Sequence, residues 1–380
     1  MLIDIIAGAR PNFMKIAPII NAIEKTQSNN EVDLQYRLIH TGQHYDKKMS
    51  EDFFVQLNIP HPFLNLEVGS GTQAEQTGKI MMGYEALLLK SPSDLCMVVG
   101  DVTSTMACSI AAKKLGIKVA HVEAGIRSGD LSMPEEINRI VTDSITDYFF
   151  TTSRVANENL FKNGIEEDRI FFVGNTMIDT LIKQMPYLKK PPIWDILNLE
   201  KHEFIVVTLH RPSNVDSTST FTDLMEEIIA SSKGLPIVFP VHPRTAKMFN
   251  LLNIDAENLH LIEPLSYLEF NYLVKNAKAV ITDSGGITEE TTIMHVPCMT
   301  LRSSTERPET CTVGTNELLG IEPSAIKPAM ERLFRGEWKE GGIPELWDGR
   351  SAERIVNIIT ELLTNHSTGH ILKGESVGVK

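Results

Sequence analysis

The sequence predicts an α/β protein made of two doubly wound domains, each a parallel sheet with crossover helices. Two observations predict this class. Short runs rich in β-branched and apolar residues alternate with longer segments of helical spacing, and such alternation indicates parallel strands joined by helices. The alternation is interrupted over residues 185–199, which hold three prolines, and it then resumes. A chain of 380 residues is also long enough for two or three domains.

The first half alternates strand and helix from its first residues. Its expected strands are Leu2–Gly8, Gln35–Gly42, Leu95–Asp101, Lys118–Gly125 and Tyr148–Ser153. Its expected helices are Pro11–Thr26, Asp46–Leu57, Gln73–Lys90, Thr103–Leu115 and Pro134–Thr146. Pro11 supports the first helix, because proline is favoured at the first helical position.

The second half repeats the pattern after the proline-rich segment. Its expected strands are Phe204–His210, Pro236–Pro243, Leu259–Leu265, Ala279–Ser284 and Cys298–Arg302. Its expected helices are Ser217–Ser232, Thr245–Leu252, Ser266–Asn276 and Ile287–His295. We therefore expect one domain over 1–175 and another over 176–364, with the polar tail 365–380 packing loosely back on the first.

Composition excludes several classes of protein. Lys and Arg number 36 against 49 Asp and Glu, a net charge of −13, which disfavours binding to nucleic acid or to an anionic membrane surface. The four cysteines form no CxxC pair, so a zinc ribbon or redox pair is not expected. No run of about 18 apolar residues is present, and the first ten residues lack a basic leader region. We expect a cytoplasmic protein with no membrane segment.

Reactive or ionic residues follow nearly every expected strand. In the first half they are Arg10, Asn12, Lys15, His44, Asp101 and Glu123. In the second half they are His210, Arg211, His242, Arg244, Asp283 and Arg302. Ligands of open α/β sheets bind beyond the carboxyl ends of the strands. We therefore expect two sheets that face each other across a cleft holding the active site.

The sharpest local motif is Asp283-Ser284-Gly285-Gly286, in which a strand leads through two glycines into a helix. Glycines allow close approach of a ligand to the backbone, and a helix N-terminus offers free N–H groups and a positive dipole end. The motif predicts a phosphate cradle, with a plain turn capped by Ser284 as the alternative. Glu290, one turn further, is expected to accept hydrogen bonds from a ribose.

Cations and carboxylates gather at the first sheet. Arg10 and Lys15 flank the start of the first helix and indicate an anionic ligand. Asp101, Glu123 and Glu135 supply carboxylates, and clustered carboxylates suit acid–base work. Arg139, four residues after Glu135, is expected to orient it; solvated surface charges are the alternative for Lys15 and Glu135.

Two cofactor classes are not favoured. His121 and Glu123 share a strand face, but no third ligand follows at short spacing, so we expect no metal. The GxGxxA match at 69–74 does not follow the first strand and is a weak signal. No GxxxxGK[ST] loop is present. We expect no cofactor.

The motifs in order resemble one family, the non-hydrolysing UDP-N-acetylglucosamine 2-epimerases. The resemblance rests on Gly8-Ala-Arg-Pro-Asn-Phe-Met-Lys15, Gly42-Gln-His44, His121-Val-Glu123-Ala-Gly-Ile-Arg127, Pro134-Glu-Glu-Ile-Asn-Arg139, His210-Arg211, His242-Pro-Arg244, Asp283-Ser-Gly-Gly-Ile-Thr-Glu-Glu290 and Thr305-Glu-Arg-Pro-Glu309. It implies the GT-B arrangement of two Rossmann-like domains. It also implies interconversion of UDP-GlcNAc and UDP-ManNAc by elimination and re-addition of UDP through 2-acetamidoglucal, feeding surface polysaccharide synthesis. We also expect a homodimer.

The resemblance assigns roles residue by residue. Its implied catalytic residues are Asp101, Glu123, Glu135 and His210. Its implied substrate-binding residues are Arg10, Lys15, Arg139, His242, Phe270, Ser284, Gly285, Gly286, Glu290 and Arg307. Three departures stand out. Asp46 replaces a glutamine of the family's activator site, residues 68–78 contain no arginine, and Leu265 replaces a polar residue near the nucleotide. We therefore expect a hyperbolic dependence of rate on UDP-GlcNAc.

Four other functions remain open at this point. A hydrolysing epimerase would release free ManNAc, and a related 2-epimerase would act on a UDP-diacetamido-uronic acid. A GT-B glycosyltransferase would need an acceptor site that the sequence does not reveal, and fold alone does not exclude one. A non-catalytic nucleotide-sugar sensor would leave the three carboxylates without a role.

Overall fold

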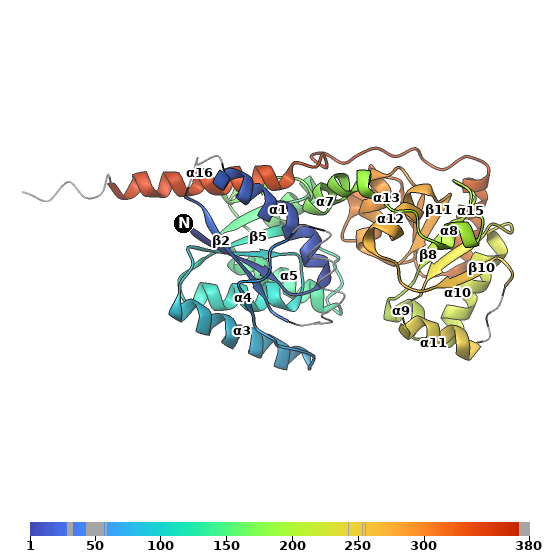
Figure 1. Cartoon of the computed structure of the whole chain (residues 1–380), viewed down its shortest axis with the longest axis horizontal. Helices are drawn as coiled ribbons and strands as arrows, with labels where there is room; N and C mark the ends of the chain where they lie inside the picture. Colours follow the sequence, from blue (N-terminus) through green and yellow to red (C-terminus); the bar gives the residue numbers. More distant parts are fainter. Residues whose placement is uncertain are drawn as a thin grey trace, which may run out of the picture. The chain divides into compact units, whose positions relative to one another are not determined.

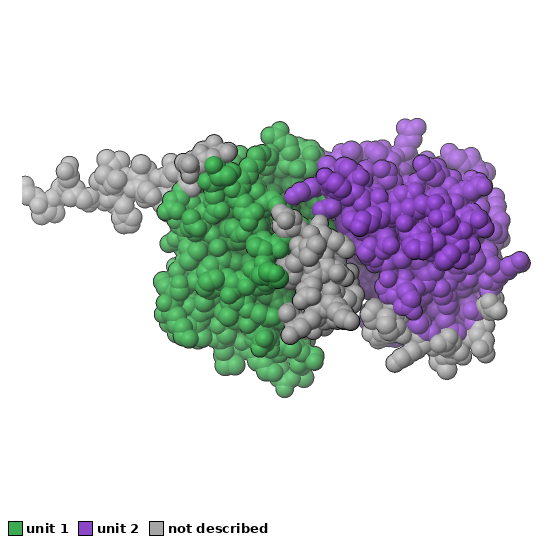
Figure 2. Space-filling view, in the orientation of Figure 1, with its two compact units in different colours: residues 1–180, 345–380 green, residues 181–344 purple. Residues whose placement is uncertain are grey.

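The computed structural model describes residues 1–28, 33–42, 57, 59–241, 243–252, 254 and 256–371. The chain forms two compact units (Figure 2). Unit 1 comprises Met1–Thr180 and Glu345–Lys380, and unit 2 comprises Leu181–Pro344.

Unit 1 is built on a parallel sheet, seven-stranded over the described residues, in the order β3-β2-β1-β4-β5-β6-β7. Its strands are β1 (Leu2–Ala7), β2 (Gln35–His40), β3 (Leu64–Asn65), β4 (Leu95–Val99), β5 (Lys118–Ala124), β6 (Tyr148–Thr151) and β7 (Ile170–Phe172). β1 is buried almost throughout, as expected for a parallel strand covered on both faces.

Helices cover both faces of this sheet. They are α1 (Arg10–Ser28), α3 (Gln73–Lys90), α4 (Thr103–Lys114), α5 (Pro134–Ile145), α6 (Arg154–Lys162), α7 (Thr176–Gln184) and α16 (Ser351–Ile371), with a 3₁₀ turn at Glu167–Arg169. Figure 1 shows α1 and α16 on one face, and α3 and α4 on the other. A capping box between Thr72 and Glu75 fixes the start of α3.

Unit 2 has a parallel sheet, six-stranded over its described residues, in the order β10-β9-β8-β11-β12-β13. Its strands are β8 (Ile205–Thr208), β9 (Ile237–Pro240), β10 (Leu259–Ile262), β11 (Ala279–Thr282), β12 (Cys298–Thr300) and β13 (Asn316–Leu318). Its helices are α8 (Ile193–Ile196), α9 (Pro212–Val215), α10 (Thr218–Ser231), α11 (Pro243–Leu252), α12 (Tyr267–Asn276), α13 (Gly285–Ile293), α14 (Pro308–Thr312) and α15 (Ile326–Phe334), with 3₁₀ turns at Met185–Tyr187 and Pro323–Ala325.

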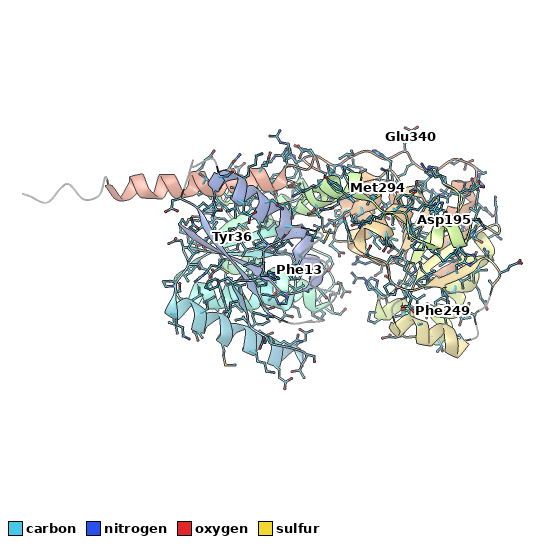
Figure 3. All side chains as sticks on the ribbon, in the orientation of Figure 1. Phe13, Tyr36, Asp195, Phe249, Met294 and Glu340 are labelled. Atoms are coloured by element: carbon cyan, nitrogen blue, oxygen red, sulfur yellow. The ribbon has the colours of Figure 1, made fainter. Side chains whose placement is uncertain are left out.

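Aromatic packing closes one face of the second sheet. Phe249 lies on α11 (Figure 3). It packs edge-on against Phe221 of α10 and Phe239 of β9, with ring centroids 5.0 and 5.4 Å apart. Edge-to-face pairs at this spacing are favourable beyond their buried area. These rings join a cluster of buried residues from α10, α15 and the sheet.

Each sheet reverses its winding direction at one point. In unit 1 this point lies between β1 and β4, and in unit 2 between β8 and β11, neighbours that are far apart in sequence. Ligands of open α/β sheets bind just beyond the strand ends at such points. Within each unit, the loops after these strands are therefore the places where functional residues are expected.

The C-terminal segment corrects the expected domain boundary. Residues 345–364 were expected in the second domain, but they belong to unit 1. Trp347 is buried and its Nε1 donates to the Thr152 carbonyl oxygen, and the Asp179 carboxylate accepts from the backbone N–H groups of Ser351 and Ala352. These contacts hold the start of α16 on unit 1. The first boundary lies after Thr180 rather than after 175.

The expected strands are all present, and each ends one to three residues earlier than expected. Asp101, His210, Asp283 and Arg302 stand in the following loops instead, whereas Glu123 lies within β5. The short strands β3, β7 and β13 were not expected. Most of the expected helix Asp46–Leu57, and residues 372–380 of the tail, lie outside the described residues. In the described part of the chain, no helix is long and apolar enough to cross a membrane.

Candidate active site

The loop between β1 and α1 is fixed by Asn12. Its Oδ1 accepts from the backbone N–H groups of Gly8 and Ala9, at 3.1 and 3.0 Å. Its Nδ2 donates to the Val99 carbonyl oxygen at 2.9 Å. Asn12 thus ties the end of β1 to the end of β4 across the winding reversal. From sequence, Asn12 was grouped with the strand-end residues but was given no role.

Lys15 and Glu123 form a nearly buried ion pair at this edge. Lys15 Nζ lies 2.5 Å from Glu123 Oε2, and the two side chains are 14% and 3% exposed. Glu123 adopts a left-handed backbone with φ of 70°, and the pairing of β5 with β6 shifts register between Val122 and Ala124. Such strain in a non-glycine residue is characteristic of functional sites.

Gly100 leaves room for this pair. It has φ of 69°, and a Cβ placed on it would lie 3.2 Å from Lys15 Nζ and 3.4 Å from Glu123 Oε2. A side chain here would be strained by the backbone and would also crowd both charged groups. Gly100 therefore lets the backbone after β4 approach the ion pair.

Arg139 of α5 pairs with one carboxylate in the loop after β4 and with another on its own helix. Its Nη2 pairs with Asp101 Oδ2, and its Nη1 lies 2.7 Å from Glu136 Oε2. Asn138 Nδ2 also donates to the Asp101 carbonyl oxygen at 2.8 Å. Asp101 is thereby held at the end of β4, close to Gly100 in the chain.

The ion pairs of Arg139 revise an expectation. We expected Arg139 to orient Glu135, but its ion pairs go to Glu136 and Asp101, because α5 turns Glu136 toward the interior. Burial by itself raises the pKa of Glu136, but hydrogen bonds from Ser128, Arg139 and Gly129 outweigh it and lower the pKa. Glu136 is a structural carboxylate that holds the preceding loop.

Glu135 differs from its neighbour. It is half-buried in the first turn of α5, and no hydrogen bond or ion pair links it to any residue that the structure describes. A carboxylate with no protein partner can serve a ligand, which fits the expected acid–base role.

A buried network lies beneath these residues. His121 Nδ1 is 2.7 Å from Asp143 Oδ1, and its Nε2 is 2.9 Å from the Gly100 carbonyl oxygen. Burial alone would raise the pKa of Asp143, but the adjacent His121 and Arg127 lower it. His121 thus connects the loop at Gly100, through Nε2, to Asp143 of α5, through Nδ1. Asp143 was not identified from sequence, although it lies in α5 only four residues after Arg139, because its contact with His121 depends on the tertiary structure.

In unit 2, Asp283 organises the loop that follows β8. It is fully buried and accepts from the backbone N–H groups of His210 and Arg211, both at 2.9 Å, and from Asn214 Nδ2 at 3.1 Å. His210 Nδ1 lies 2.8 Å from Asp283 Oδ1. Burial raises the pKa of Asp283, but hydrogen bonds and charge from His210 and the loop N–H groups bring it below its ordinary value.

This arrangement defines what His210 can do. A carboxylate on Nδ1 fixes the ring orientation and favours a proton on that nitrogen, which leaves Nε2 for a ligand. The His210 side chain is 56% exposed, so Nε2 is accessible. Proton transfer or hydrogen bonding to an anionic group is chemically available to it.

The glycine motif opens α13 as expected. Ser284 is the N-cap residue, but its side chain makes no capping hydrogen bond, unlike the capped turn considered as the alternative. Its backbone N–H donates to Thr282 Oγ1 at 3.0 Å. The start of α13 at Gly285 and Gly286 therefore has the features of an anion site, glycines and a helix N-terminus without side-chain capping.

Glu290 lies in the interior, one turn into α13. Burial raises its pKa to about 7, although Tyr267 and Asn271 oppose this. Asn271 Nδ2 lies 3.5 Å from Glu290 Oε1. Phe270, expected beside a uracil, is partly buried on α12 and packs on the second-unit core.

Arg307 is 5% exposed, and its Nε lies 2.5 Å from Glu289 Oε1.

Some predicted residues lie outside the part of the chain that the structure describes. The Arg10 side chain and the whole of His242 lie outside the described residues, as do Gln43 and Asp46. Arg302 and Glu306, described below, were not given a role from sequence, although Arg302 was noted at a strand end.

Fold and site together define a class. Two Rossmann-like parallel sheets, one with clustered carboxylates and one with a glycine-rich helix N-terminus, are the architecture of GT-B nucleotide-sugar enzymes. The profile of the family described as UDP-N-acetylglucosamine 2-epimerase matches residues 25–360. The chain belongs to this family and is an epimerase.

Individual relatives agree with the family match. The UDP-N-acetylglucosamine 2-epimerase of Methanocaldococcus jannaschii is 42% identical, over 95% of this chain and 99% of that protein. The one from Methanococcus maripaludis is 41% identical, over 94% and 98%. The crystal structure of the M. jannaschii UDP-GlcNAc 2-epimerase in complex with UDP-GlcNAc and UDP has a TM-score of 0.84 at 41% identity, covering 95% of this chain and 100% of that one.

Proposed function

We propose that this protein interconverts UDP-GlcNAc and UDP-ManNAc by anti elimination and re-addition of UDP. The observation that carries the proposal is the family match over residues 25–360, supported by relatives of that name at about 40% identity over almost the whole chain. Each unit also holds one part of the chemistry that this reaction needs.

Unit 2 is suited to the leaving group. The N-terminus of α13 at Ser284–Gly286 offers backbone N–H groups to a diphosphate, and His210 presents Nε2 after Asp283 has oriented its ring. Negative charge grows on the diphosphate as its bond to sugar C1 breaks, so donors placed there lower the barrier. Glu290 is proposed to accept from the ribose and Phe270 to lie beside the uracil. Arg307 is proposed as a further nucleotide contact.

Unit 1 is suited to the sugar. Asp101, Glu123 and Glu135 are proposed to take a proton from C2 and to return one to its other face. As the C2–H bond breaks, its electron pair forms the C1–C2 double bond of 2-acetamidoglucal, and the C1–O pair leaves with UDP. Re-addition of UDP to C1 and protonation of C2 on the opposite face give the epimer. Lys15, beside Glu123, is proposed to bind substrate, together with Arg10, Arg139 and His242.

Proton NMR in D2O tests this mechanism. Incubation with UDP-GlcNAc should give UDP-ManNAc with deuterium at C2 and none at C3 or C4. Traces of 2-acetamidoglucal and UDP should accumulate on long incubation, and the reaction should survive EDTA and need no added NAD. Deuterium at C3 or C4 would replace this mechanism with an oxidative one, and free ManNAc as the main product would identify a hydrolysing epimerase.

A second substrate has specific support. The UDP-2,3-diacetamido-2,3-dideoxy-D-glucuronate 2-epimerase of Pseudomonas aeruginosa is 39% identical over 95% of this chain and 100% of that protein. Its chemistry at C2 would need the same carboxylates. Comparing kcat/KM for the two UDP-sugars decides between them, and a clear preference for the diacetamido sugar would reassign the substrate.

We also propose a cytoplasmic homodimer that supplies an acetamido sugar for surface polysaccharide synthesis. Support for the dimer comes from large apolar side chains exposed on unit 1. Met82 and Leu89 of α3 are 64% and 68% exposed, and Ile137 and Ile140 of α5 are 49% and 40% exposed. Light scattering after size exclusion tests it, since a monomer mass at micromolar concentration would rule the dimer out.

A further inference from the structure

Arg302 follows β12, and one of its side-chain donors has no partner in the described part of the chain. The residue is 5% exposed, and its Nη2 lies 2.7 Å from Glu306 Oε2. Its Nη1 is buried and has no hydrogen-bond partner among the residues that the structure describes. A buried charged donor without an acceptor is costly and therefore needs an explanation.

Arg302 Nη1 lies beside the start of α13. Nη1 is 3.6 Å from the position that a Cβ on Gly285 would occupy. Gly285 is the first residue of this nine-residue helix, whose N-cap Ser284 makes no side-chain capping bond. The guanidinium and the helix N-terminus, which both favour anions, thus meet at one point.

The charges named around this point are those of Arg302, Arg211, Glu306 and Asp283, two positive and two negative. Glu306 Oε1 is 2.9 Å from the same Cβ position and 4.0 Å from Arg211 Nη2. One carboxylate therefore faces two guanidinium groups and a helix N-terminus. The other nearby carboxylate, Asp283, accepts from the loop N–H groups and pairs with His210. What remains for a further anion is the N-terminus of α13, which has no side-chain cap, and Arg302 Nη1, which has no partner among the described residues.

We propose that Arg302 is a further binding residue for the substrate diphosphate, donating through Nη1 to a phosphate oxygen at the N-terminus of α13. The inference rests on the proposed function, because it assumes that a UDP-sugar is bound. Glu306 holds the guanidinium in place through Nη2 and compensates its buried charge while no ligand is present. Glycine at 285 is needed because a Cβ there would collide with Glu306 and fill the space between Arg302 and the anion.

If Arg302 binds the phosphates, its loss should affect ligands with and without a diphosphate differently. A purely structural role predicts the same effect on both. Loss of Nη1 should weaken a ligand that carries the diphosphate and leave one without it unchanged. UDP and uridine differ in just this way, since both carry the base and ribose. A damaged fold would weaken both together.

The experiment compares full-length wild type with Arg302→Met, Arg302→Lys and Arg332→Met. Arg332 is the matched control, because its Nη2 pairs with Glu317 Oε2 at 2.5 Å on the surface of the same unit. UDP binding is measured by titration calorimetry and uridine binding by ligand-observed NMR. Arg302→Met should weaken UDP by roughly 10- to 100-fold, the range for a hydrogen bond to a charged group, with uridine unchanged. Arg332→Met should change neither.

Arg302→Lys covers the case in which the Met variant does not fold. A single ammonium cannot reproduce the two-armed contact of a guanidinium, so UDP should weaken by about tenfold with uridine unchanged. Equal losses for both ligands, or no loss, would overturn the role of Arg302 while a wild type that binds UDP and epimerises upholds the function. A wild type that does not bind UDP would overturn both.

Discussion

His210 Nδ1 lies 2.8 Å from the buried carboxylate of Asp283. The same carboxylate accepts hydrogen bonds from backbone N–H groups of the loop that carries the histidine. One aspartate therefore fixes both the position of the loop and the orientation of the ring. Because its pKa is held below the ordinary value, Asp283 stays ionised at neutral pH, and its stabilising contribution is lost only as pH falls through that depressed pKa.

The first prediction concerns this pair. Asp283→Asn removes the charge that orients His210, so kcat should fall by about 10²-fold, the lower part of the range for acid–base groups. Since Asp283 acts through His210, the double variant with His210→Gln should lose no more activity than His210→Gln alone. Losses that simply multiply would show that the two residues act independently, and circular dichroism checks that the variants fold.

The second prediction uses two glycines with similar backbones. Gly100 has φ of 69° and faces Lys15 and Glu123, whereas Gly116 has φ of 76° and no atom within 4 Å of its Cβ position. Alanine at either position should cost about 1–2 kcal/mol of unfolding free energy, from the left-handed backbone alone. Only Gly100→Ala should also lower kcat, by crowding the ion pair. Similar kcat values for both variants would remove Gly100 from the site.

The third prediction concerns pH and Glu290. Its pKa is raised from 4.5 to about 7, so the folded state holds this proton after the unfolded state has lost it. The stabilisation is fully present below about pH 4.5 and is lost as pH rises through 7. At 1.36 kcal/mol per pKa unit the change is about 3 kcal/mol.

Urea unfolding at several pH values measures this effect. Wild type should lose stability between pH 5 and 7.5, and Glu290→Gln should show a smaller loss over the same range. Glu226→Gln, which removes an exposed carboxylate from α10 of the same unit, serves as the control. If the unfolding free energies of wild type and Glu290→Gln changed with pH in parallel, the proton responsible would not be bound to Glu290.

The fourth prediction concerns the carboxylates of unit 1. Asp101→Asn, Glu123→Gln and Glu135→Gln should each lower kcat by about 10²–10⁴-fold. UDP affinity should change little, because these groups are proposed to act on the sugar. Glu158→Gln, exposed on α6, is the control. If all three variants kept more than about half of the activity, the proposed acid–base roles would have to be abandoned.

The sequence predicts the fold class, the positions of Asp101, Glu123 and Ser284 at or near strand ends, and that of Lys15 in the first helix, because these depend on local patterns. Alternation and glycine placement are visible along the chain, and parallel strands then bring their ends to one edge. The left-handed backbone of Glu123 is not visible in this way, since glutamate rarely adopts it and only the tertiary structure enforces it.

The sequence does not show which side chains pair with each other in the folded structure. Glu135 and Glu136 are adjacent acids in the same helical turn, and the direction that each faces depends on how α5 packs. Arg302 and Glu306 are four residues apart in a loop, where no helical spacing rule applies. The return of α16 to unit 1 depends on contacts of Trp347 and Asp179 that span more than 170 residues of sequence.

Because α16 belongs to unit 1, the two units are completed in a fixed order during synthesis. Unit 2 is one continuous stretch, Leu181–Pro344, whereas unit 1 needs segments from both ends of the chain. A ribosome that adds about 5–20 residues per second makes the 164 residues of unit 2 between the two parts of unit 1, a delay of roughly 8–33 s. The half of the protein that is begun first is thus completed last, and a chain truncated before residue 345 would leave unit 1, not unit 2, without its last helix.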